Sequence, residues 1–258
     1  MARPIHKEKN GIPAKALKVF STVVADDLAM LASLHDKEPV EEFLQLLRED
    51  SFPDGLGLKL ISENGKRAAA LMKEGLASLP QPADETTLDE LAADYADIYL
   101  NHGIQASPQE SVWIDEENLI CQDTMFQVRA WYESHGLAAA DWRTRPDDHL
   151  VLELQFLAHL FAADPSEDVL REAAQFMDEH LLRWLIDFGT RVGQRAATSY
   201  FAGVATLTSA YCDELRELLV NILHEPRPSR EEIDERMAPT REREEVEVAF
   251  VPGMGPAV

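Results

Sequence analysis

The sequence predicts an all-α protein, a single helical domain of about ten helices with an irregular C-terminal tail. Apolar residues recur at spacings of three and four along nearly the whole chain, which is the period of an amphipathic helix. Alternation with period two, the pattern of a half-buried strand, is sustained only near the C-terminus, in VEVAFV at residues 246–251. A chain of 258 residues can also bury a core of its own without metals or disulfides.

Helix start and stop signals divide the chain into elements. Thr87 and Glu90 have the spacing of a capping box, in which two side chains satisfy free backbone N–H groups at a helix start. A second box is predicted at Ser229 and Glu232. The predicted helices cover residues 13–34, 39–48, 62–79, 87–102, 119–135, 147–163, 166–177 and 196–223, with a short one after the second box. We therefore expect a helical domain over residues 1–238 and a flexible or loosely docked tail over residues 239–258.

Two apolar features between these signals predict packing. Residues 104–118 lack helical spacing, but they contain Val112, Trp113 and Ile114, so we expect an ordered loop rather than a linker. Large aromatic or histidine side chains recur every four residues and predict a buried stripe along one helix face: Phe176, His180, Trp184 and Phe188.

The charge of the chain is strongly negative and unevenly distributed. The formal net charge is −23, which argues against nucleic acid as a partner, because binding to phosphates depends on Lys and Arg. Residues 74–123 contain twelve Asp or Glu and no Lys or Arg, and the next cation is Arg129. This segment is either a solvated acidic face or a surface for a cationic partner.

The cysteines and the apolar runs bear on the compartment. Cys121 and Cys212 are far apart and show no metal-ligand spacing, as expected of core thiols in a reducing compartment. No apolar run has the length of a membrane span, and the N-terminus MARPIHKEKNG lacks the apolar stretch of a signal peptide. These features predict a cytoplasmic protein.

The sequence offers little chemistry. It contains no GxxxxGK[ST] loop, no GxGxxG after a strand, no GxSxG and no HExxH. The best candidate for a metal site is His149 with Glu153 one helical turn later, joined by His159 and His180. The paired Glu-x-x-His motifs of helical di-iron proteins are missing, so we expect neither a metal nor a cofactor. A helical metalloprotein or enzyme that uses His149, Glu153 and His159 remains the alternative.

Three motifs occur together in one order and are more specific than any one alone. They are YADIYLNHG at residues 95–103 with PQESVW at 108–113, RPDDHLVLELQFLAHL at 145–160, and FMDEHLLRWLIDF at 176–188. Together they resemble the signature of the TorD/DmsD family of redox-enzyme maturation chaperones. Ile98 and Tyr99 stand where that family usually has Leu and Phe, and Arg145 replaces an acidic residue, which suggests a different peptide preference.

The resemblance implies a function without catalysis. Members of this family are all-helical cytoplasmic chaperones that bind the twin-arginine signal peptide, the body, or both, of a molybdopterin oxidoreductase subunit until its cofactor is loaded. A twin-arginine peptide carries two guanidinium groups and then an apolar stretch, so its receptor needs carboxylates beside apolar surface. We expect that partner here, and a monomer or a domain-swapped dimer.

We expect the peptide site where the 104–118 loop meets the start of the helix predicted at 147. The candidate peptide-binding residues are Tyr95, Tyr99, Glu110, Ser111, Trp113, Asp147, Asp148 and His149. In this hypothesis Asp147 or Asp148 pairs with a peptide arginine and His149 orients the loop, while Trp113 packs against the apolar part. Acidic residues in the first turn of a helix also favour its dipole, so the two aspartates alone do not require a function.

The C-terminal tail lies outside the resemblance and has two interpretations. Residues 240–258 can be a disordered end. Because VEVAFV is apolar at alternate positions, the tail can instead dock into a groove of its own or of a neighbouring molecule, in imitation of a client.

Overall fold

Helices account for every regular element of the described structure. The structure is a computed structural model that describes residues 13–114, 119 and 122–238. The elements are α1 (Ala14–Asp36), α2 (Glu41–Glu49), α3 (Glu63–Ala77), α4 (Glu85–Tyr95), the π-helix η1 (Ala96–Leu100), α5 (Ser111–Ile114), α6 (Asp123–Ser134), α7 (Leu150–Ala163), α8 (Glu167–Glu179), the 3₁₀ helix η2 (Leu181–Arg183), α9 (Leu185–Arg195), α10 (Ser199–Leu223) and α11 (Arg230–Met237). The predicted all-α fold class is confirmed.

Side-chain caps start several of these helices where the sequence predicts them. The Ser166 side chain accepts a hydrogen bond from the Val169 backbone at the start of α8. At α11 the predicted capping box is present, with Glu232 N donating to Ser229 Oγ at 3.2 Å and Ser229 N donating to the Glu232 carboxylate at 2.7 Å. These caps confirm the helix starts after residues 166 and 229.

The predicted capping box at residue 87 is wrong, because Asp84 caps α4 three residues earlier. Asp84 Oδ1 accepts hydrogen bonds from Thr87 N at 2.9 Å and from Thr87 Oγ1 at 2.7 Å. Thr87 therefore lies in the first turn. The same helix was expected to run regularly to His102, but beyond Tyr95 it continues as the wider π-turn η1.

Three further helix boundaries differ from the prediction. Before α7, His149 is the N-cap, so Asp147 and Asp148 precede the helix instead of forming its first turn. The helix expected from residue 119 begins at Asp123, and the one expected from residue 196 begins at Ser199.

The predicted stripe at 176–188 is buried but does not follow one helix. His180 ends α8 with φ −125° and ψ −83°, outside the helical region, and η2 leads into α9. The four predicted side chains are nevertheless fully buried: Phe176, His180, Trp184 and Phe188. The bend lets both helices face the same core.

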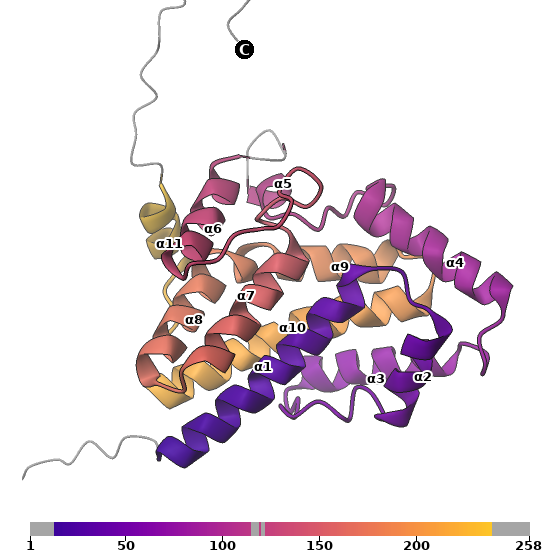
Figure 1. The fold of residues 1–258 in the computed structure, drawn as a ribbon, viewed down its shortest axis with the longest axis horizontal. Coiled ribbons are helices and arrows are strands. Elements are labelled where there is room, and N and C mark those ends of the chain that lie inside the picture. The colour runs from indigo at the N-terminus through magenta and orange to yellow at the C-terminus, as the bar shows by residue number, and fades with distance from the viewer. Residues whose placement is uncertain (1–12, 115–118, 120–121, 239–258) are drawn as a thin grey trace, which may run out of the picture.

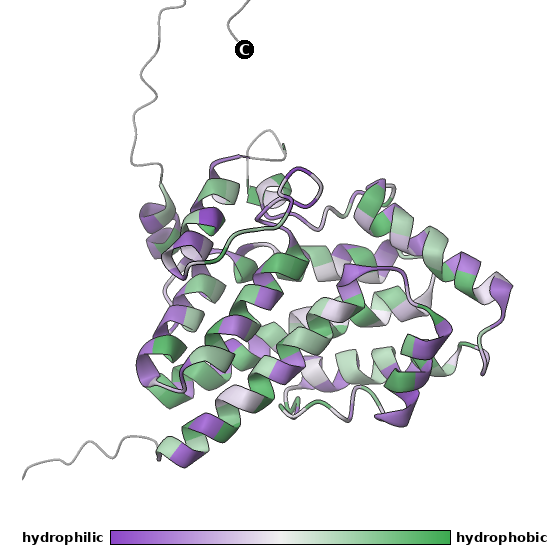
Figure 2. Cartoon of the chain, in the orientation of Figure 1, coloured by the Kyte–Doolittle hydropathy of each residue, from purple (hydrophilic) through white to green (hydrophobic). Residues whose placement is uncertain are grey.

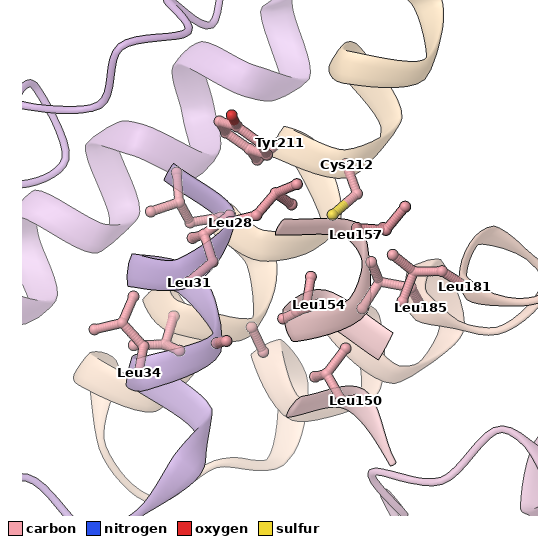
Figure 3. Close-up of a cluster of buried hydrophobic side chains, with 14 of the residues drawn as sticks. Leu28, Leu31, Leu34, Leu150, Leu154, Leu157, Leu181, Leu185, Tyr211 and Cys212 are labelled. Carbon is pink, nitrogen blue, oxygen red and sulfur yellow. The ribbon is translucent and has the colours of Figure 1, made fainter. Parts of the chain in front are cut away.

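The helices pack across the sequence rather than along it. α1 lies along α7, and α10 lies along α3 and α9 (Figure 1). Apolar residues follow α1, α7 and α10 where they pack, whereas α11 is mostly hydrophilic (Figure 2). The leucines of α1 and α7 meet α9 and α10 in one cluster that includes Tyr211 and Cys212 (Figure 3). Cys212 is a free, buried thiol as expected, and burial raises its pKa, while Cys121 lies outside the described residues.

Glycines bring α3 and α10 into close contact. A Cβ atom added at Gly203 would lie 2.7 Å from the Met72 Cα, and one added at Gly75 would lie 2.5 Å from the Ser199 carbonyl oxygen. Each helix thus supplies a glycine where the backbone of the other approaches, which gives α10 a fixed position beside α3.

Candidate functional site

The two segments predicted to form the site lie against each other. Gln109 and His149 form an antiparallel β-bridge. Leu150 N donates to the Pro108 carbonyl at 2.8 Å, and Glu110 N donates to the Asp148 carbonyl at 3.0 Å. This contact between residues 108–111 and 147–150, which we call the junction, places α5 beside the start of α7 (Figure 1).

Asp148 is a fully buried tether within the junction. Its Oδ2 accepts hydrogen bonds from Ser111 N at 2.9 Å and Ser111 Oγ at 2.5 Å. Burial raises the pKa of Asp148, and the hydrogen bonds from Ser111 oppose that shift. The carboxylate thus faces the interior of the protein and holds the loop, rather than an open cleft.

Asp147 already binds an arginine, which belongs to the same chain. Arg129 on α6 donates to Asp147 Oδ2 from Nη2 at 2.8 Å and from Nε at 3.2 Å. The same guanidinium lies 5.3 Å from the Phe126 ring centroid and 5.2 Å from that of Trp142. Carboxylate and aromatic rings together show that this surface can hold a guanidinium group.

His149 orients the start of α7, and among the described residues it is not grouped with its predicted metal-ligand partners. Its Nδ1 accepts a hydrogen bond from Val151 N at 3.2 Å, and burial lowers its pKa to about 3, so the ring is neutral. Glu153 is fully buried on α7, whereas His159 is exposed, because six residues along a helix place two side chains about 120° apart around its axis. Within the described residues no group of three or more His, Cys, Asp or Glu is arranged to hold a metal ion.

Glu153 belongs instead to a buried acidic cluster beneath the junction. Glu110 Oε2 pairs with His180 Nδ1 at 3.0 Å, and both side chains are fully buried. Burial raises the pKa of Glu110, opposed by His180. Burial likewise raises the pKa of Glu153 well above its usual range, and the charges of Glu110 and Asp148 add to the shift. The neutral acid is therefore the favoured form of Glu153.

Trp113 is half-buried at the edge of the junction and is bordered by cations. Its Nε1 donates to the Ser107 carbonyl at 2.8 Å. The guanidinium of Arg191 lies 4.4 Å from its ring centroid, and Arg191 also donates to the Gln105 carbonyl at 2.9 Å. α9 thus fixes one side of the loop and places a guanidinium group over the Trp113 ring.

Tyr95 and Tyr99 lie together in a separate aromatic cluster. Their ring centroids are 4.7 Å apart, and both side chains are buried. The Tyr95 hydroxyl donates to the Asp36 carbonyl at 2.8 Å, and the Tyr99 hydroxyl is bonded to His35 Nδ1 at 2.5 Å. Arg145 connects this cluster to the segment before the junction, since its Nη2 donates to the same Asp36 carbonyl at 3.0 Å.

A group of exposed carboxylates lies on the elements before the junction. Exposed carboxylates of α4 and η1, with the α4 N-cap, form what we call the α4–η1 acidic surface: Asp84, Glu85, Asp89, Glu90 and Asp97. None of these carboxylates forms a salt bridge with another described residue. Asp94 is the exception on α4, because it is buried and accepts hydrogen bonds from the Ala197 and Thr198 backbone at the start of α10.

The structure brings together Glu110, Ser111, Asp147, Asp148 and His149, with Trp113 at their edge. The sequence did not predict the side chains that pair with the two acids, which are Arg129 for Asp147 and His180 for Glu110. Arg129 could have been suspected as a partner, because it is the first cationic residue after the acidic segment. No pattern in the sequence marked His35, which is fully buried between Tyr99 and Thr208.

Known proteins resemble this chain over most of its length. Residues 63–189 match the family described as nitrate reductase delta subunit. The chaperone protein TorD of Vibrio vulnificus strain CMCP6 is 30% identical over 211 residues, covering 76% of this chain and 94% of that protein. The chain belongs to the TorD family of chaperones. Another TorD, from Vibrio cholerae serotype O1 strain ATCC 39541, is 27% identical over 217 residues, covering 81% of this chain and 97% of the relative.

Membership of the TorD family confirms the resemblance found in the motifs. A solved structure of a candidate redox enzyme maturation protein from Archaeoglobus fulgidus aligns with a TM-score of 0.40 and 18% identity, covering 84% of this chain and 99% of that chain. Both TorD relatives are named as chaperones. In the described part of this TorD-family chain, no helix has both the length and the apolar character needed to cross a membrane.

Proposed function

We propose that this TorD-family chaperone binds the arginine-containing leader peptide of a molybdenum-containing oxidoreductase while that enzyme matures. The observation that carries the proposal is the α4–η1 acidic surface, whose carboxylates are exposed and form no salt bridge with other described residues. Exposed carboxylates without a counter-ion attract guanidinium groups and speed their association. A leader peptide is met before export, so this activity belongs in the cytoplasm.

The order of side chains along the chain suits such a peptide. After Asp97 comes Leu100, which is 64% exposed, and then the half-buried Ile104 and Trp113. The two arginines of the peptide would bind the carboxylates, and the apolar stretch that follows them in the peptide would contact these three side chains.

The junction has a positioning role in this proposal. Ser111 and Asp148 hold the loop that carries Trp113, His149 pairs with Gln109 of that loop, and Glu110 anchors the loop to His180 in the core. Tyr95 and Tyr99 fix the end of the α4–η1 element against α1. Asp147 already binds the guanidinium of Arg129, so a peptide arginine could bind Asp147 only by replacing Arg129.

The experiment is a binding measurement with leader peptides taken from the molybdenum oxidoreductases of the same organism. Asp89→Asn with Glu90→Gln removes two charges from the α4–η1 acidic surface and should weaken binding about fivefold, in line with partly exposed ion pairs. Calorimetry with the full chain gives the affinity. A peptide in which the paired arginines are replaced by alanine should bind weakly to both proteins.

The matched control removes the same charge elsewhere. Asp26 on α1 and Glu235 on α11 are exposed and form no salt bridge with a described residue. Asp26→Asn with Glu235→Gln should leave leader affinity unchanged. If both double variants bind equally, the location of the leader site is wrong. If the chaperone binds the oxidoreductase equally with and without its leader, recognition of the enzyme body replaces the proposal.

A further inference from the structure

An aromatic and cationic patch lies on the outer surface beside Asp147. The Phe126 side chain is 53% exposed and that of Trp142 is 40% exposed. Arg129 lies over both rings, and Arg143 lies over Trp142 with its guanidinium 5.1 Å from the ring centroid. We call Phe126, Arg129, Trp142 and Arg143 the aromatic–arginine patch.

This patch differs from the rest of the surface in two respects. Most charge on the protein is negative, with 47 acidic and 24 basic residues, yet two arginines meet here. Arg143 is exposed and forms no salt bridge with another described residue. Large exposed aromatic side chains next to each other also mark surfaces that another segment covers. The patch therefore fits an apolar segment that carries carboxylates.

The chain itself brings such a segment to the patch. α11 ends at Met237, whose carbonyl accepts a hydrogen bond from Gln127 Nε2 at 3.1 Å. Gln127 is the neighbour of Phe126 on α6, so the chain leaves the described fold beside the patch. Phe250 lies thirteen positions after Met237, which is enough to span about 40 Å when extended, so residue 250 can reach the patch.

The composition of that segment matches the patch. Residues 241–247 contain four glutamates and two arginines, so they carry a net negative charge, and the apolar residues that follow include Phe250 and Val251. The segment thus offers carboxylates for guanidinium groups and a phenyl ring for the two exposed aromatics.

We propose that residues 239–258 dock on the aromatic–arginine patch of their own chain, with glutamates next to Arg143 and Phe250 against Phe126 and Trp142. Covalent attachment beside the patch keeps the segment at a local concentration of the order of millimolar, so weak contacts suffice. The proposal stands independently of leader binding, since it concerns two parts of one molecule. Because the patch surrounds the Asp147–Arg129 pair, a docked tail would also compete with any partner that approaches Asp147.

A photo-crosslinking residue placed at position 250 of the full chain tests the contact. We expect benzoylphenylalanine at this position to form crosslinks to peptides that contain Phe126 or Trp142, identified by mass spectrometry. Arg143→Glu should reduce the crosslink yield severalfold, while Arg143→Lys, which keeps the charge, should retain most of it. Circular dichroism verifies that each variant keeps its helices.

The matched control is Arg67→Glu. Arg67 is exposed on α3 and forms no salt bridge with a described residue, so this variant changes the net charge equally but away from the patch. Its crosslink yield should equal that of the unmodified sequence. Crosslinks that map elsewhere, or equal losses in both charge reversals, would overturn the proposal. Mixing with isotope-labelled protein adds a second check, because mixed-isotope crosslinks would place the tail on another molecule and overturn docking within the chain.

Discussion

Ser111 offers the sharpest probe of a single residue in the junction. It donates two hydrogen bonds to Asp148 Oδ2, and both side chains are fully buried. Ser111→Ala leaves the buried carboxylate with one donor fewer, so we expect the free energy of unfolding to fall by about 1–3 kcal/mol. Urea denaturation measures the change. Ser33→Ala is the control, because Ser33 is exposed and bonds only to the Ala29 carbonyl in its own helix; an equal effect of the two substitutions would contradict the tether.

Glu153 predicts how stability depends on pH. Its pKa in the folded protein is raised well above the usual value of about 4.3, so between these two pKa values the native state holds a proton that the unfolded state releases. The free energy of unfolding should therefore fall as pH rises through this window, by up to about 1.4 kcal/mol per pH unit for this one group.

Glu153→Gln removes that contribution and should make the dependence on pH shallower. Chemical denaturation between about pH 5 and pH 8 measures the slope. Glu74→Gln, at an exposed position on α3 that forms no salt bridge with another described residue, should keep the original slope. An unchanged slope in the Glu153 variant would mean that Glu153 is ionised in the folded protein.

At the scale of single residues, the sequence identified the two segments that form the junction but not the buried groups that contact them. Paired motifs marked Glu110, Ser111 and Asp148 as residues that belong together, and the structure places them within hydrogen-bonding reach. Their burial depends on which groups lie opposite, such as His180, which is 70 positions away in sequence from Glu110. Periodicity within one segment carries no information about such partners.

Among the elements, the α3–α10 pair should respond most strongly to a small change in volume. At Gly203 an added methyl group would lie 2.7 Å from the Met72 Cα, which is backbone and cannot move aside alone. Gly203→Ala should therefore destabilise the protein by about 1–3 kcal/mol, although alanine favours helix. Thermal or urea denaturation gives the value.

A glycine on α9 provides the comparison. At Gly193 the added methyl group would meet only the Thr206 hydroxyl, at 3.0 Å, which is the end of a side chain. Gly193→Ala should be neutral or slightly stabilising, because alanine has the higher helix propensity. Equal effects at positions 193 and 203 would show that the close approach of α3 and α10 is not rigid.

Most helices were predictable because their signals are local. The caps at residues 166 and 229 need only the neighbouring sequence, and the structure contains both. The departures have tertiary causes: His180 leaves the helical conformation while remaining fully buried, bonded to Glu110 of another segment. The cap of α4 is Asp84, three residues before the predicted box.

For the molecule as a whole, the unbalanced charge predicts a strong effect of salt. Raising the salt concentration from about 0.05 M to about 0.5 M should weaken binding of a twin-arginine peptide severalfold, because exposed charges are screened. The double variant at Asp89 and Glu90 should lose less affinity over the same range, since part of the attraction is already missing. Equal salt dependence in the two proteins would place the attraction elsewhere.

The fold class was predictable from periodicity, and the family from three motifs in a fixed order. The position of the exposed charge was only partly predictable. Twelve acidic residues in one segment indicated a negative surface, but Asp94 and Glu110 turn inward, and five of the exposed members form the α4–η1 acidic surface. Which carboxylates face solvent follows from packing against α7, α8 and α10, and this was not visible in the segment itself.

The interleaving of early and late helices implies that the chain cannot be divided at its middle. α1 packs along α7 and α3 along α10, so each helix pair joins a piece before residue 115 to a piece after residue 122. Expressed separately, residues 1–114 and 122–258 would each leave a long apolar face uncovered. Neither fragment should be helical and monomeric alone, whereas co-expression should yield a reconstituted two-chain protein whose spectrum matches that of the uncut one.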